Sequence, residues 1–135
     1  MNPLTKQSLQ YIKKHGTNFV PAVLPKDLQR GDVGDCFDIC AIQALHHQQY
    51  QYVEGIAKVR NGRWIYHAWL TDGVHAFDPT WRAITDEGWD KPIPAEYLGV
   101  ILPIMQVAEF MKKTEYKAVF ANRFRAPELV ERMLA

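Results

Sequence analysis

A cysteine, a histidine and an aspartate that are distant in the sequence have the types and the order of a thiol-histidine-acid site. Cys36, His67 and Asp78 follow one another in that order along a chain of 135 residues. A thiolate is the reactive form of cysteine, an imidazole can take the thiol proton, and a carboxylate can orient the imidazole. If the fold brings the three side chains together, the chemistry is nucleophilic attack by sulfur.

The first of these residues, Cys36, opens a predicted helix in the segment GDVGDCFDICAIQALHHQ. Asp35 is a suitable N-cap, and Asp38 lies three positions later. Residues 36–45 are apolar nearly all round, which is typical of a helix buried in the middle of a domain. At the first turn, backbone N–H groups and the positive end of the helix dipole favour thiolate over thiol. We therefore expect Cys36 to be the nucleophile.

Downstream of this helix the hydrophobic period changes to two. Asn-Gly at 61–62 and Asp-Gly at 72–73 are strong hairpin signals between short runs of aromatic and branched residues. The sequence therefore predicts three antiparallel strands: Tyr50–Val59, Trp64–Leu70 and Val74–Phe77.

This meander positions the histidine and the acid. His67 lies on the second predicted strand and Asp78 follows the third, and the turn between them folds one strand back beside the other. Pro79 biases Asp78 toward an extended backbone, so the carboxylate is presented from a stiff corner. We expect Asp78 to hold one ring nitrogen of His67 and to leave the other directed at Cys36.

Four ordered segments, GDCFDICAIQAL, YVEGIAKV, HAWL and DGVHAFDPTW, resemble the core of the transglutaminase-like superfamily. The resemblance covers residues 31–81. It implies a papain-like α+β fold in which a central helix headed by cysteine packs on an antiparallel β-sheet. It also implies that Cys36 is the nucleophile, His67 the base and Asp78 the orienting acid, acting on amide or ester carbonyls through a thioester.

The sequence differs from the larger members of that superfamily in having no flanking domains and no acidic cluster typical of a calcium site, so calcium-dependent crosslinking is not expected. Small relatives look more like cysteine peptidases, amidases or deamidases. The expected substrate is a peptide, a protein or a small amide, with no cofactor. A domain that kept this fold and lost turnover, and now binds or scaffolds, is the alternative.

Two tryptophans flank the predicted site. Trp69 lies two residues past His67 and therefore on the same face of its strand, where it either shields the imidazole, lines an acyl-binding groove or packs in the core. Trp81 is expected to anchor the loop that follows it rather than to touch substrate.

Three polar residues are weaker candidates for substrate or oxyanion binding. Glu54 is a charge within an apolar strand, which favours an exposed position over a role in the site. Gln29 and Asn18 precede the cysteine helix and are candidates for a second oxyanion donor beside the Cys36 backbone N–H.

Cys40 is one helical turn from Cys36, a spacing that is unfavourable for a disulfide, and its apolar surroundings predict a core position. A redox or metal protein that uses both thiols is a second alternative. Zinc is disfavoured, because His46, His47 and His75 do not form a second short ligand pair.

The remaining chain predicts one α+β domain over residues 1–135, with no linker or internal repeat. Prolines predict an extended loop at Thr17–Leu28, and turn-forming residues predict a loop after Trp81 through Pro94, packed by Trp81 and Trp89. The other predicted elements are helices at Asn2–His15, Pro103–Lys113 and Pro127–Leu134 and strands at Tyr97–Leu102 and Tyr116–Ala121.

Composition excludes several classes of partner. Sixteen basic residues nearly balance fifteen acidic ones, giving a net charge of +1, so a nucleic-acid partner is not expected. The longest apolar run, residues 97–105, is too short to cross a bilayer, and no signal peptide is visible. We expect a cytoplasmic protein with reduced thiols, and the oligomeric state is left open.

Overall fold

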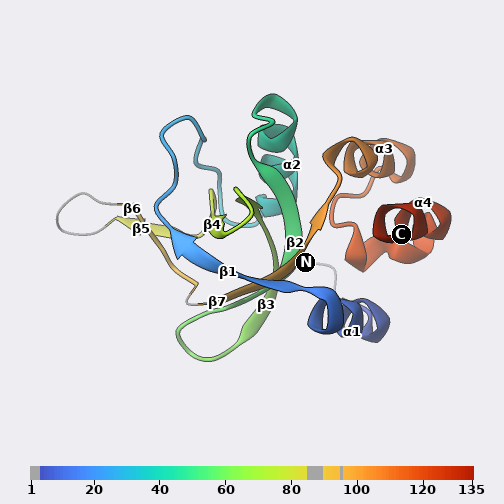
Figure 1. Ribbon diagram of the computed structural model, residues 1–135, viewed down its shortest axis with the longest axis horizontal. Coiled ribbons are helices and arrows are strands. Elements are labelled where there is room, and N and C mark those ends of the chain that lie inside the picture. Colours follow the sequence, from blue (N-terminus) through green and yellow to red (C-terminus); the bar gives the residue numbers. More distant parts are fainter. Residues whose placement is uncertain (1–3, 85–89, 95) are drawn as a thin grey trace.

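Five strands close into a small β-barrel in the computed structural model, which describes residues 4–84, 90–94 and 96–135 (Figure 1). Around the barrel each strand pairs with the next and the last returns to the first: β1 (Thr17–Ala22), β4 (His75–Phe77), β3 (Trp64–Thr71), β2 (Gln51–Lys58) and β7 (Glu96–Leu102). The β1–β4 pair is parallel and the others are antiparallel. The α+β class predicted from the sequence is confirmed, with a closed barrel in place of the expected antiparallel sheet.

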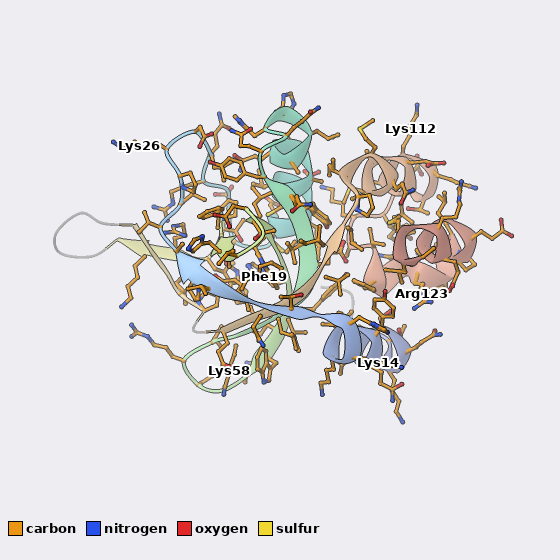
Figure 2. All side chains as sticks on the ribbon, viewed as in Figure 1. Lys14, Phe19, Lys26, Lys58, Lys112 and Arg123 are labelled. Atoms are coloured by element: carbon orange, nitrogen blue, oxygen red, sulfur yellow. The ribbon has the colours of Figure 1, made fainter. Side chains whose placement is uncertain are left out.

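The barrel interior is filled by side chains that alternate with outward-facing ones along each strand. This inner cluster of buried residues consists of Phe19, Val53, Ala57, Trp69, Ala76 and Tyr97. In the view of Figure 2, Phe19 lies near the centre, whereas Lys26 and Lys112 lie at the edge. The next residues along β2, such as Tyr52 and Ile56, point outward into a second, larger core.

That outer core is covered by the helix α2 (Cys36–His46), which packs on β2 and β3. Phe37, Cys40, Ala41 and Ala44 are its buried apolar contacts. The prediction of a central helix that begins at Cys36 and packs on the meander is therefore confirmed.

Over the residues that the structure describes, three further helices and a 3-10 helix lie beside the barrel, as Figure 1 shows. The predicted N-terminal helix begins at Lys6 rather than at residue 2, because the Thr5 side chain caps it by accepting the Ser8 N–H at 3.1 Å. Residues 2 and 3 lie outside the described residues. These helical elements are α1 (Lys6–His15), α3 (Ile104–Thr114), η1 (Phe120–Arg125) and α4 (Pro127–Leu134). Within the described residues, no helix has the length and apolar character needed to span a membrane.

The prediction of an extended loop at Thr17–Leu28 is wrong for its first part, because residues 17–22 form β1. Val20 donates its N–H to the carbonyl of Val74, the residue before β4, at 2.9 Å. Backbone N–H groups alternate in direction along a strand, so the missing N–H of Pro21 lies on the β7 side, where the pairing with β7 stops at Phe19. A proline is therefore tolerated inside this strand.

The segment after Trp81 also differs from the prediction of a loop. Arg82–Ile84 forms β5 and Asp90–Pro92 forms β6, and the two pair antiparallel as a separate ribbon. Figure 1 shows this ribbon projecting on the side away from α4. The expected packing of Trp89 lies outside the described residues.

The prediction of a strand at Tyr116–Ala121 is wrong, and a buried carboxylate explains why. Val119 and Phe120 donate their backbone N–H groups to Glu54, at 2.8 and 3.0 Å. A strand partner would need those same donors. The chain instead turns into η1 over Glu54.

The exposed position predicted for Glu54 is also wrong, because its side chain is completely buried. Besides the two backbone N–H groups, it accepts the hydroxyls of Tyr52, at 2.6 Å, and Tyr66. Burial raises the pKa of Glu54, and these hydrogen bonds oppose the shift. Four donors thus satisfy the carboxylate and join β2 and β3 to the C-terminal segment.

Replacing Glu54 by Gln should destabilise the fold by about 3 kcal/mol, because an amide cannot accept four hydrogen bonds and its NH2 group would face donors. Urea unfolding at neutral pH measures this. The matched control is Glu96→Gln on β7, whose carboxylate forms an exposed ion pair with Lys58 at 3.3 Å. That control should cost less than about 1 kcal/mol, and equal losses in both variants would contradict the assigned role of Glu54.

Candidate active site

An open edge of β3 carries His67. In the described part of the chain, β3 pairs with β2 along its whole length, but with β4 only at Leu70 and Thr71. Since β4 ends at Phe77, opposite Leu70, the next residue, Asp78, leaves the sheet beside the part of β3 that contains His67. The short third strand of the meander is what brings the acid to the histidine.

His67 and Asp78 form a buried pair. The distance from His67 Nε2 to Asp78 Oδ2 is 2.8 Å, and the two side chains are 1% and 0% exposed. Burial alone would lower the pKa of His67, but the charge and hydrogen bond of Asp78 outweigh it and raise the pKa to about 9. His67 is therefore an imidazolium near neutral pH.

Asp78 is held from several sides. Its Oδ1 accepts the backbone N–H groups of Thr80 and Trp81, both at 3.1 Å, and its Oδ2 accepts the Tyr97 hydroxyl at 2.7 Å. Burial would raise the pKa of Asp78, yet the adjacent imidazolium and these hydrogen bonds lower it below its usual value. The carboxylate thus stays ionised and fixed.

Cys36 lies at the start of α2. Cys36 and His67 line the same cavity, of about 360 Å³. A hydrogen bond with Cys36 is among the causes that raise the pKa of His67. Because Nε2 of His67 is bonded to Asp78, Nδ1 is the nitrogen that remains for the thiol. The fold therefore brings the three predicted side chains together.

The walls of the cavity come from α2, β3 and the segment that precedes η1. Phe37 packs against Tyr66 with ring centroids 4.8 Å apart. Asp38 forms an ion pair with Lys117 at 3.1 Å, which connects the first turn of α2 to the opposite wall. Asp35 also lines the cavity: it is the N-cap residue, as predicted, but its side chain forms no capping hydrogen bond.

Trp81 contacts the candidate site directly, whereas the sequence predicted only that it anchors the loop that follows it. Its ring stacks on the imidazole of His67, with centroids 4.3 Å apart and an angle of 28° between the planes, and it lines the cavity. The indole therefore covers one face of the imidazole. Asp78 sets this placement, because its Oδ1 holds the Trp81 N–H in a turn that starts at the acid itself.

Trp69 is a core residue. It is fully buried inside the barrel, where it packs on Tyr97 with ring centroids 4.9 Å apart. Gly99 makes room for it, since a Cβ at residue 99 would lie 2.7 Å from Trp69 Cζ2. Core packing is therefore observed for Trp69, and its ring also lies beside the imidazole of His67, with centroids 6.2 Å apart and an angle of 30° between the planes, as expected if it shields the imidazole. The ring is not among the residues that line the cavity, so a role in an acyl-binding groove is not supported.

The other weak candidates also lie outside this cavity. Asn18 is exposed on β1. Gln29 is exposed too, and its backbone N–H and carbonyl bond to the Gln43 side chain at 2.5 and 2.7 Å. Glu54 is satisfied in the fold as described above, and none of the three lines the cavity.

Cys40, one turn below Cys36, is fully buried, as predicted for a core residue. Burial raises the pKa of its thiol well above the usual value, and the negative charge of Asp78 adds to the shift. Both cysteines are free thiols. The fold therefore makes the two sulfurs chemically different, with Cys36 at the cavity and Cys40 in the core.

Neither a metal-ligand cluster among the described residues nor a known relative points to a role for this site. Among residues 4–84, 90–94 and 96–135, no group of three or more His, Cys, Asp or Glu side chains is arranged to hold a metal ion. No family model, no curated protein and no solved structure matches this chain.

The His67–Asp78 pair predicts a pH-dependent stability. The pKa of His67 is raised from 6.5 to about 9 by folding, so the pair's stabilisation is complete below about pH 6.5 and is lost as the pH rises through 9. Its full size is about 3 kcal/mol. Urea unfolding of the wild type and His67→Gln should therefore show a stability difference that narrows between about pH 6.5 and 9.5.

The control for this measurement is His46→Gln, at the exposed end of α2. Because the His46 side chain is exposed, its stability difference from the wild type should be small. A gap for His67→Gln that stays constant through pH 9 would show that the pair is not ionised as described.

Proposed function

We propose that this chain is a cysteine-dependent acyl-transfer enzyme, a peptidase, amidase or deamidase, with a papain-like core related to the transglutaminase-like superfamily. One observation carries the proposal: Cys36 and His67 line one cavity, and Asp78 is hydrogen-bonded to Nε2 of the same imidazole. The order of these residues, and the packing of the Cys36 helix on β2 and β3, agree with it.

The protonation of His67 supplies the first requirement of such a reaction. An imidazolium beside Cys36 stabilises a thiolate, as do the N–H groups at the first turn of α2. The thiolate attacks the carbonyl carbon of an amide and forms a C–S bond, and the carbonyl oxygen becomes an oxyanion. The Cys36 backbone N–H, at the helix start, is the proposed oxyanion donor.

Collapse of this intermediate needs a proton on the leaving nitrogen. His67 Nδ1 gives its proton to that nitrogen, the C–N bond breaks, and the amine or ammonia departs, leaving a thioester on Cys36. Water or an acceptor amine then attacks the thioester, and neutral His67 takes a proton from that nucleophile. The C–S bond breaks and the thiolate and imidazolium are restored. Asp78 keeps the ring oriented through both transfers.

The size and lining of the cavity favour a small acyl group. A volume of about 360 Å³ holds one or two residues of a peptide or a small amide. Aromatic rings of Tyr66 and Trp81 and the apolar Val33 and Ala118 offer contacts to the acyl part. We therefore propose that a short segment of a peptide or protein, or a free amide, enters beside Cys36.

Reaction with iodoacetamide tests the nucleophile. At about pH 6.5 the wild type should form a single adduct on Cys36, located by intact-mass and peptide mass spectrometry. His67→Ala should slow the labelling at least about tenfold, because the imidazolium that favours the thiolate is gone. Cys36→Ala should abolish it. Cys40→Ala is the matched control, one helical turn away, and should keep the wild-type rate.

The reaction class needs a separate measurement. The wild type should form an acyl-enzyme, trapped as a hydroxamate by hydroxylamine, with at least one member of a panel of peptide anilides, glutamine peptides and small amides, and Cys36→Ala should not. Labelling that falls on Cys40, or that ignores His67, would contradict the proposed site. A reactive Cys36 without turnover of any amide would instead favour a binding or scaffold domain.

A further inference from the structure

Asp78 Oδ2 has two partners that approach it from different elements. His67 Nε2, on β3, lies 2.8 Å away, and the Tyr97 hydroxyl, on β7, lies 2.7 Å away. Oδ1 is occupied by the backbone N–H groups of Thr80 and Trp81. The oxygen that orients the histidine is therefore also the oxygen that the tyrosine holds.

The position of Tyr97 is set by the barrel. Its ring belongs to the inner cluster, is 1% exposed and packs edge-on against Trp69. β7 is paired on both sides, with β1 and with β2, so its backbone is fixed by two ladders. Asp78 sits on the turn after β4, outside the ladders. A rigid element therefore supplies the hydroxyl, and a turn supplies the carboxylate.

We propose that Tyr97 is a positioning residue of the candidate active site: its hydroxyl anchors the Asp78 carboxylate on His67 Nε2, so that Nδ1 of the ring faces Cys36. Its catalytic meaning rests on the proposed function. The anchoring itself does not, because it concerns three buried side chains of the folded protein.

Other ionisable groups surround this oxygen. On α2, the charge of Asp78 acts on Cys40, and Cys36 interacts with His67. On β5, Arg82 donates from Nη1 to the Ala22 carbonyl at 3.1 Å and to the Asp78 carbonyl at 3.5 Å, and its charge also acts on Tyr97. Burial and then the charge of Asp78 raise the pKa of Tyr97 far above its usual value. The hydroxyl therefore remains a donor throughout the range in which His67 titrates.

Tyr97→Phe is the direct test, because it removes the hydroxyl and keeps the ring in the barrel. The His67 titration is followed by NMR of histidine labelled with ¹⁵N. Loss of the hydroxyl should raise the pKa of His67 by at least about 0.5 pH unit, since Oδ2 then shares its negative charge with the imidazolium alone. Tyr52→Phe, which removes a hydroxyl from the buried Glu54 instead, is the matched control and should leave that pKa in place.

A second measurement needs no variant. In wild-type protein with ¹³C-labelled tyrosine, the Cζ resonance of Tyr97 should shift as His67 titrates near pH 9, while that of Tyr52 should not. A His67 pKa unchanged in Tyr97→Phe, or a Tyr97 resonance that ignores the titration, would reduce Tyr97 to a packing residue. Neither readout depends on turnover, so failure of the proposed function, seen as an unreactive Cys36, remains a separate outcome.

Discussion

The buried ion pair between His67 and Asp78 is the constraint around which the site is arranged. Two charged groups without solvent are costly unless their remaining hydrogen-bonding capacity is satisfied. Asp78 meets this condition with two backbone N–H groups on one oxygen and a hydroxyl and the imidazole on the other. The pair fixes the position of one ring nitrogen and keeps the imidazole protonated. It thereby sets the charge and the remaining nitrogen that the imidazole offers to Cys36.

Much of this arrangement can be predicted from the sequence because it is local. The helix that starts at Cys36 and the hairpin that places Asp78 next to His67 follow from hydrophobic period and turn residues, which act over a few positions. Tyr97 and the stacked ring of Trp81 could not be found in the same way. Tyr97 reaches Asp78 only because the sheet closes through β7 and β1, a pairing that no short-range signal specifies.

The errors share this physical cause. A proline in residues 17–22 argues against a strand, unless its ring lies where the neighbouring ladder has ended, which depends on register with β7. Residues 116–121 have the composition of a strand, yet Glu54 takes the N–H groups of Val119 and Phe120. The sequence predicts an exposed Glu54 because the partners of its carboxylate are up to 66 positions away. Tertiary contacts override local preference in each case.

Glu54 and Asp78 are both buried carboxylates, but they have different roles in this small barrel protein. Both carboxylates are fully buried and both accept tyrosine hydroxyls. All the hydrogen-bond donors to Glu54 are neutral, and burial raises its pKa, whereas Asp78 faces an imidazolium and its pKa is lowered. Neutral donors satisfy a charge without creating another one. A titratable partner instead couples the carboxylate to a proton that can move, and that partner lines the cavity beside a thiol.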